Sequence, residues 1–261
     1  MTRYWVLLIG VVFGVVTRGF AQTRSNKAFK SGEELTYRIY YSSAIIDATA
    51  GEAILTLHQT VADKIVKNDT LFHVTGTGFS KRLFDLFFKV RDTYESYFDR
   101  QTLLPDIFIR DTHEGSYSRY DSVEFNQKGL SAKTSRKELT IPPKTFDILS
   151  AVYYMRTLQV EDFNADSIYL INFYLDDSVY RSAIKYLGRD TLVSKQGKIP
   201  ALKLAPMMAT GEVFADKYPM FVWVTDDKNH LPVFATSAII VGAVNVELIK
   251  YKNLSHPFIK R

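Results

Sequence analysis

The side chains of this chain that could catalyse a reaction are mainly acidic. Asp226 and Asp227 are adjacent, as are Asp176 and Asp177. Two carboxylates that face one groove can act as acid and base in glycan hydrolysis. Neighbouring residues of a strand point to opposite faces, so neither pair is a catalytic dyad by itself. Aspartate also stabilises turns by accepting bonds from nearby backbone N–H groups. We therefore interpret Asp226 and Asp227 as turn residues, with a carbohydrate hydrolase as the alternative.

The other common catalytic and metal-binding patterns are missing from the sequence. The chain has no cysteine, which excludes disulfides, thiol nucleophiles and thiolate metal sites. The five histidines are His58, His73, His113, His230 and His256. None of them follows another at the spacing that two metal ligands on one helix require. The chain also lacks the Gly-x-Ser-x-Gly nucleophile motif and a complete glycine-rich nucleotide motif. No metal and no cofactor is predicted.

Aromatic residues give the better indication of function, since the chain contains 16 Tyr and 18 Phe. Aromatic side chains on a curved sheet can line a cavity for an apolar ligand, although they can equally form the core. Arg156 could hold an anionic head group, because guanidinium pairs well with carboxylate or phosphate. It could instead stabilise the negative end of a helix. The candidate ligand contacts are Tyr37, Tyr41, Tyr153 and Arg156.

Strand-like alternation dominates the elements that must position these residues. In Glu34–Tyr41, for example, apolar and polar residues alternate. Turn residues recur every eight to twelve positions, which is typical of an antiparallel meander. After Pro142-Pro143, the apolar spacing in Phe146–Gln159 predicts a helix. Ser80–Phe87 is a second short helix or a bulged strand. The sequence predicts a mainly β fold: a curved antiparallel sheet, half-barrel or β-roll with one central helix on its concave face.

Residues 1–21 are interpreted as a signal peptide. Arg3 is followed by the apolar run Tyr4–Val16 and by Ala21 at the cleavage position. Residues 22–261 are then one β-rich domain, or two β halves joined across the helix. No later run has the length of a membrane span, and without cysteine the protein is not a lipoprotein. We expect a soluble protein in the periplasm or outside the cell. The 33 basic and 28 acidic residues are interleaved, unlike the basic stripe of a nucleic-acid binder.

Several motifs, in their order along the chain, resemble those of the exported bacterial domain of unknown function numbered 3108. They are Gly32–Tyr37, Ala50–Ala53, Phe146–Arg156, Trp223–Asp227 and Leu231–Val233. The resemblance implies a β-rich periplasmic or cell-envelope protein without an established activity. It carries over no catalytic residues.

Two functions remain open at this point. The first is a non-enzymatic binding or structural module of the cell envelope, with a lipid, a lipoprotein or an envelope glycan as candidate partner. The second is the hydrolase with aspartates near residue 226. A binder requires an apolar cavity beside the helix, whereas a hydrolase requires two carboxylates about 5–10 Å apart in an open polar groove.

Overall fold

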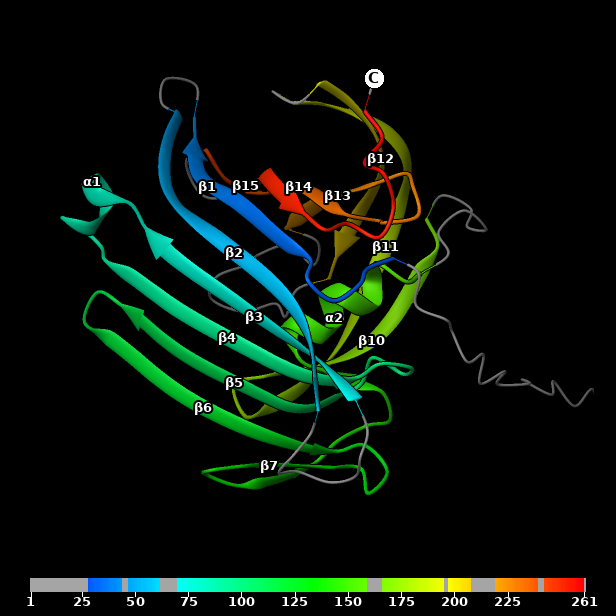
Figure 1. Ribbon diagram of the computed structural model, residues 1–261. Helices are drawn as coiled ribbons and strands as arrows, with labels where there is room; N and C mark the ends of the chain where they lie inside the picture. Colours follow the sequence, from blue (N-terminus) through cyan, green and yellow to red (C-terminus); the bar gives the residue numbers. More distant parts are fainter. Residues whose placement is uncertain are drawn as a thin grey trace, which may run out of the picture.

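The structure is a computed structural model that describes residues 28–43, 47–61, 70–158, 166–194, 197–207, 219–238 and 242–260. The predicted signal peptide lies outside these ranges. The described residues form a fifteen-stranded sheet and two helices (Figure 1). Among them, no helix is long and apolar enough to cross a bilayer.

The elements follow the predicted meander along most of the chain. The helices are α1 (Arg82–Asp85) and α2 (Ile148–Met155). The strands are β1 (Glu34–Ser42), β2 (Asp47–Val61), β3 (Thr70–Ser80), β4 (Val90–Asp99), β5 (Pro105–Glu114), β6 (Tyr117–Asn126), β7 (Ser131–Thr134), β8 (Glu138–Thr140), β9 (Thr145–Phe146), β10 (Ile168–Leu175), β11 (Ser178–Ser194), β12 (Gly197–Pro206), β13 (Met220–Thr225), β14 (Pro232–Ala238) and β15 (Ala243–Lys252).

Nearly every strand pairs with its sequence neighbour in antiparallel orientation, as the turn spacing predicts. The exceptions are β1, which also pairs with β15 in the middle of the sheet, and the short β9, which runs parallel to β10. β7 and β8 form a short hairpin. The long strand β11 has a register shift between Tyr186 and Gly188.

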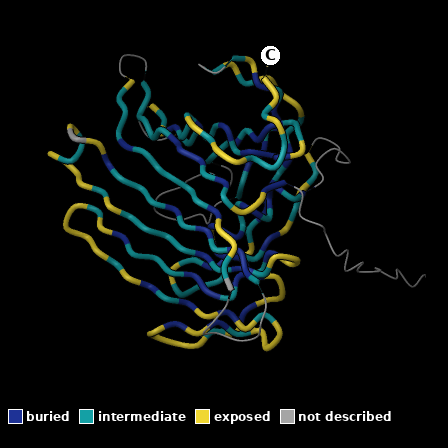
Figure 2. Tube along the Cα trace, viewed as in Figure 1, coloured by how far each residue is buried: buried dark blue, intermediate teal, exposed yellow. Residues whose placement is uncertain are grey.

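The sheet curves around α2, which lies on its concave face between the two halves of the sheet (Figure 1). Leu149 and Tyr153 of α2 pack against Leu57 of β2 and other residues of the first half. Met155 packs against the second half, for example against Leu204 of β12. The buried residues gather where the helix meets the strands, and the hairpin turns are largely exposed (Figure 2). The predicted curved β fold with a central helix is therefore confirmed.

Asp147 caps the N-terminus of α2. Asp147 accepts hydrogen bonds from the backbone N–H groups of Leu149 and Ser150, and Ser150 Oγ accepts one from the N–H of Asp147 in return. This capping box satisfies groups that a helix start leaves unpaired. A further bond, from Ser96 Oγ of β4, fixes Asp147 to the sheet at 2.6 Å. The helix is shorter than the predicted Phe146–Gln159, because turns follow Met155.

A network of ion pairs, which we call the edge network, joins strands near one end of the sheet to the β10–β11 turn near the other end. Asp121 of β6 is its centre and accepts hydrogen bonds from three arginines. All three arginines also reach the β10–β11 turn, where Arg110 binds Asp176 at 2.6 Å. The full network consists of Arg110, Arg119, Arg136, Asp121, Asp176 and Asp177. Side chains therefore connect edges that share no strand pairing.

The edge network should make the protein sensitive to acid. Burial raises the pKa of Asp121, but hydrogen bonds from its three arginines outweigh burial and lower that pKa from 3.8 to about 2. Because the carboxylate is favoured in the folded state, its contribution to stability is present above pH 3.8 and is lost as the pH falls through about 2. At 1.36 kcal/mol per pKa unit, that contribution is about 2 kcal/mol. We expect Asp121→Asn to abolish this part of the fall in unfolding free energy between pH 5 and pH 2, measured by urea denaturation.

The matched control for this measurement is Asp47→Asn, since the side chain of Asp47 is 60% exposed. It should leave the acid profile within about 0.5 kcal/mol of the wild type. An identical acid profile for wild type and Asp121→Asn would contradict the role given to Asp121.

Candidate functional site

The C-terminal end of α2 carries a buried ion pair between Arg156 and Glu33. Arg156 Nη1 lies 2.5 Å from Glu33 Oε1, and Nη2 lies 2.8 Å from Oε2. The guanidinium also donates to the backbone carbonyls of Asn229 and Ala28, at 3.1 and 3.2 Å. The side chains of Arg156 and Glu33 are 1% and 0% exposed. The pair therefore connects α2 to the start of β1 and to the β13–β14 turn inside the protein.

Two of the predicted ligand contacts belong to this buried cluster. Tyr153 donates a 3.4 Å hydrogen bond to Glu33, and Tyr37 donates one to the carbonyl of Pro232 at 3.1 Å. Burial raises the pKa of both phenols, so both remain protonated donors. The structure does not support direct contact between Arg156 and an anionic ligand, since Glu33 and two carbonyls hold its guanidinium. Arg156 and Tyr153 instead bind the helix end to Glu33.

Tyr41 and the two aspartates lie away from that cluster. Tyr41 is half-buried near the other end of β1, beside Gly242. Asp226 accepts a 2.9 Å bond from Arg189. Asp227 accepts bonds from Thr225 Oγ1 and from the N–H of Asn229, at 2.7 and 2.8 Å. Asp227 thus organises its own turn, an arrangement that does not support the hydrolase alternative.

The side of α2 that is not packed against the sheet is apolar. Ile148 is 42% exposed, and Ala151 and Val152 are half-buried. Ile148 and Val152 are four residues apart and share one helix face. A helix face that meets water is ordinarily polar. The sheet therefore covers these apolar residues of α2 only in part.

The concave face is not equally filled along β3. A Cβ added to Gly76 would lie 3.4 Å from Leu149 Cδ2, so α2 rests directly on Gly76. A Cβ added to Gly78 would meet nothing closer than Asp92 Cβ, at 3.9 Å. Both glycines point to the concave face, because residues two apart on a strand share a side. The concave face is therefore filled at Gly76 and more open at Gly78.

The carboxyl groups next to Gly78 are partly buried. Asp92 of β4 pairs with Gly78, and burial raises its pKa above 3.8. Glu114 of β5 has a raised pKa too, because of burial and the neighbouring charge of Asp92. Raised values mean that these groups lose their charge more readily than carboxyls in water.

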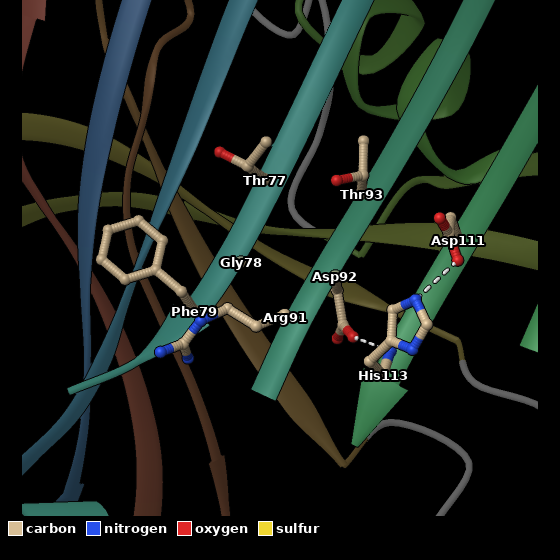
Figure 3. Close-up of a pocket in the computed structure, with 8 residues that line it drawn as sticks. All are labelled: Thr77, Gly78, Phe79, Arg91, Asp92, Thr93, Asp111 and His113. Carbon is tan, nitrogen blue, oxygen red and sulfur yellow. Dashed lines mark hydrogen bonds and ion pairs between the residues drawn. The ribbon is translucent and has the colours of Figure 1, made fainter. Parts of the chain in front are cut away.

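The opposite, convex face carries a hollow of about 330 Å³ over β3, β4 and β5 (Figure 3). His113 Nε2 lies 3.0 Å from Asp111 Oδ1, and Asp92 accepts a bond from the N–H of His113. The lining residues of the hollow are Thr77, Gly78, Phe79, Arg91, Asp92, Thr93, Asp111 and His113. Recognising it from sequence would have required the register of three strands.

Comparison with solved structures supports the fold. A β-barrel-like protein of the domain of unknown function DUF1849 from Brucella abortus has a TM-score of 0.54 at 8% identity, over 86% of this chain and 98% of that chain. A protein with a YmcC-like fold from Bacteroides fragilis has 11% identity over 86% of this chain and 99% of its own, but a TM-score of 0.31. At such identities only the fold of the first is informative.

No curated protein matches the sequence. The model of one protein family does match it, over residues 36–249, and the description of that family is "protein of unknown function (DUF3108)". This match includes α2, most of β1 and of β15, and all the strands between these two in the sequence. The chain belongs to the DUF3108 family.

Proposed function

We propose that this protein is an exported, non-enzymatic module that binds an apolar ligand, a lipid acyl chain, on the concave face of its sheet. The apolar face of α2 at Ile148 and Val152 carries the proposal, because it is exposed inside the curve of the sheet. Burying that face against an acyl chain would contribute about 25 cal/mol for each Å² of apolar surface removed from water.

The residues selected from the sequence then have two different roles. Tyr41 is the candidate ligand contact, since it is half-buried near the C-terminal end of β1. Tyr153 and Arg156 support the helix from within the protein, and Tyr37 bonds the carbonyl of Pro232. A lipid is favoured over an envelope glycan, because Ile148 and Val152 have no polar atoms with which to bind sugar hydroxyls.

Export is the part of the proposal that rests on the sequence. Arg3, the apolar run Tyr4–Val16 and Ala21 are typical of a cleaved signal peptide. We infer cleavage before Gln22 and a location in the periplasm or outside the cell. N-terminal sequencing of secreted protein would overturn this inference if the mature chain began at Met1.

Ile148→Glu should weaken binding of a fluorescent fatty acid at least tenfold. The substitution places a charge where the acyl chain is proposed to lie, and burying an unpaired charge is costly. Fluorescence titration measures the dissociation constant. In thermal melts, a ligand present at 100 times its dissociation constant should stabilise the wild type by about 2.7 kcal/mol and the variant much less.

The matched control is Ile168→Glu. Ile168 is 55% exposed, and its neighbour Tyr169 packs with the core cluster around Met155, so Ile168 points to the outer face. This variant should bind the fatty acid as the wild type does. Equal affinity of all three proteins, or a wild type that binds no fatty acid, would refute the proposed binding face.

A further inference from the structure

The connection between β3 and β4 forms an exposed apolar tip, which we define as residues 81–89. Four large side chains extend from α1 and the turn after it: Leu83, Leu86, Phe87 and Phe88 are 76, 78, 87 and 53% exposed. The tip lies at an outer corner of the sheet, well away from α2 (Figure 1). Single exposed apolar residues are ordinary, but a contiguous group of four large ones marks an interaction surface.

Polar bonds at its base hold the tip in this orientation. Asp85 forms an ion pair with Arg91 at 2.8 Å and accepts a hydrogen bond from Ser80 Oγ. Ser80 Oγ also accepts the N–H of Val90 at 2.8 Å. Phe88 N–H donates to the carbonyl of Phe84 at 2.7 Å. These bonds connect the segment to β4, while its four large apolar side chains are exposed.

Basic residues outnumber acidic residues in the sequence of this segment. Residues 81–91 contain Lys81, Arg82, Lys89 and Arg91 and one acidic residue, Asp85. Lys81 pairs with Glu52 at 2.5 Å, and Arg91 pairs with Asp85 at 2.8 Å. Segments that insert into the surface of an anionic membrane typically combine Leu and Phe with flanking lysine and arginine. Each basic residue near such a surface adds to the attraction. An apolar tip that bound protein would gain less from this excess of positive charge.

An aromatic residue of the next hairpin extends the surface. Gly115 N–H donates to the carbonyl of Lys89 at 2.8 Å, so the β5–β6 turn lies directly beside the tip. Tyr117, at the start of β6, is 52% exposed. Tyrosine is enriched where a membrane meets water, because its ring is apolar and its hydroxyl polar.

We propose that the tip docks this protein on an anionic lipid bilayer, with Leu83, Leu86, Phe87 and Phe88 inserted among the lipids and Lys89 at the phosphate level. A narrow projection suits insertion into a bilayer better than it suits a stable protein interface, which needs about 800 Å² from each partner. The inference stands apart from the proposed ligand site, because it uses none of the residues on α2.

The test uses protein exported with its own signal and vesicles of phosphatidylcholine with or without phosphatidylglycerol. Flotation should recover the wild type with the vesicles that contain phosphatidylglycerol, and added salt should weaken the association. The Leu86→Ser, Phe87→Ser double variant should bind at least tenfold less, and Lys89→Glu should lose most of the preference for phosphatidylglycerol. Thermal melts of both variants should match the wild type, because these side chains are exposed.

The control is the Ile168→Ser, Leu170→Ser double variant, which removes two apolar residues that are 55 and 68% exposed on β10. It should float like the wild type, and so should Ile148→Glu, so the two proposals can fail separately. Docking on membranes is refuted if the wild type stays at the bottom of the gradient, without the vesicles. It is refuted as well if the tip variant floats with the vesicles to the same extent as the wild type. It is also refuted if size-exclusion chromatography shows a wild-type dimer that the tip variant loses, since a second copy would then cover the tip.

Discussion

Arg156→Met should destabilise the protein by about 3–5 kcal/mol, the usual cost of leaving one member of a buried ion pair without its partner. The carboxylate of Glu33 is fully buried and takes two of its hydrogen bonds from the guanidinium. Methionine fills part of the space but supplies no donor. Urea denaturation at pH 7, with the midpoint and slope compared to the wild type, measures the loss.

A second substitution separates the charge from the packing. Arg156 Cζ lies 5.2 Å from the ring centres of Phe29 and Tyr153, so the side chain also packs against aromatic rings. Adding Glu33→Leu to Arg156→Met removes the unpaired charge and should recover more than half of the lost stability, because apolar replacements of a buried pair are often tolerated. The two changes are thus coupled rather than additive.

Arg189→Met is the matched control. Arg189 pairs with Asp226 at 2.9 Å, but its side chain is 60% exposed. Exposed pairs contribute about 0–1 kcal/mol, and the control should stay within that range. A loss below about 1 kcal/mol for Arg156→Met as well would show that the buried pair does not hold α2 in place.

Local patterns were sufficient for the elements of this fold. A half-buried strand alternates apolar and polar side chains, so the alternation in Glu34–Tyr41 was sufficient to predict a strand. The structure has β1 at Glu34–Ser42. Helix spacing after Pro142-Pro143 identified α2, whose capping residue is Asp147. Each of these signals lies within about ten residues of chain.

Long-range pairing could not be predicted in the same way. Glu33 and Arg156 are 123 positions apart, and nothing near either residue indicates the other. From its position near the predicted helix end, Arg156 was interpreted as a partner of the helix dipole or of a ligand. The edge network is similar, because Arg110 and Asp176 meet only after the whole sheet has curved. Such contacts depend on register and curvature, which sequence periodicity does not encode.

Exposure was the second property that periodicity could not decide. The cluster of Leu83, Phe87 and Phe88 at helical spacing could have been part of the core. In the structure it is the exposed tip, since α1 is only four residues long and has no sheet face over it. Ile148 shows the same limit on α2. Apolar spacing identifies the face of a helix, but the neighbouring elements decide whether that face is covered.

Leu149→Ala should cost about 2–5 kcal/mol of unfolding free energy, the range for removing a buried leucine side chain. Leu149 is 7% exposed and packs in one cluster with Val74, Phe98 and Tyr153. Its Cδ2 lies 3.4 Å from the position of a Cβ on Gly76, so the strand and the helix are in close contact there and leave a cavity when the side chain is lost. Urea denaturation measures the change.

The neighbouring residue supplies the control, because Ile148→Ala removes a side chain of the same size from a position that is 42% exposed. It should cost less than Leu149→Ala by at least about 1 kcal/mol, since much of the Ile148 side chain already meets water. Gly76→Ala adds a methyl group 3.0 Å from Leu55 Cδ2 and 3.4 Å from Leu149 Cδ2, and Leu149→Ala should relieve part of its cost. Equal losses for Leu149→Ala and Ile148→Ala, without coupling to Gly76, would mean that α2 does not rest on β3 and that the concave face is not built as described.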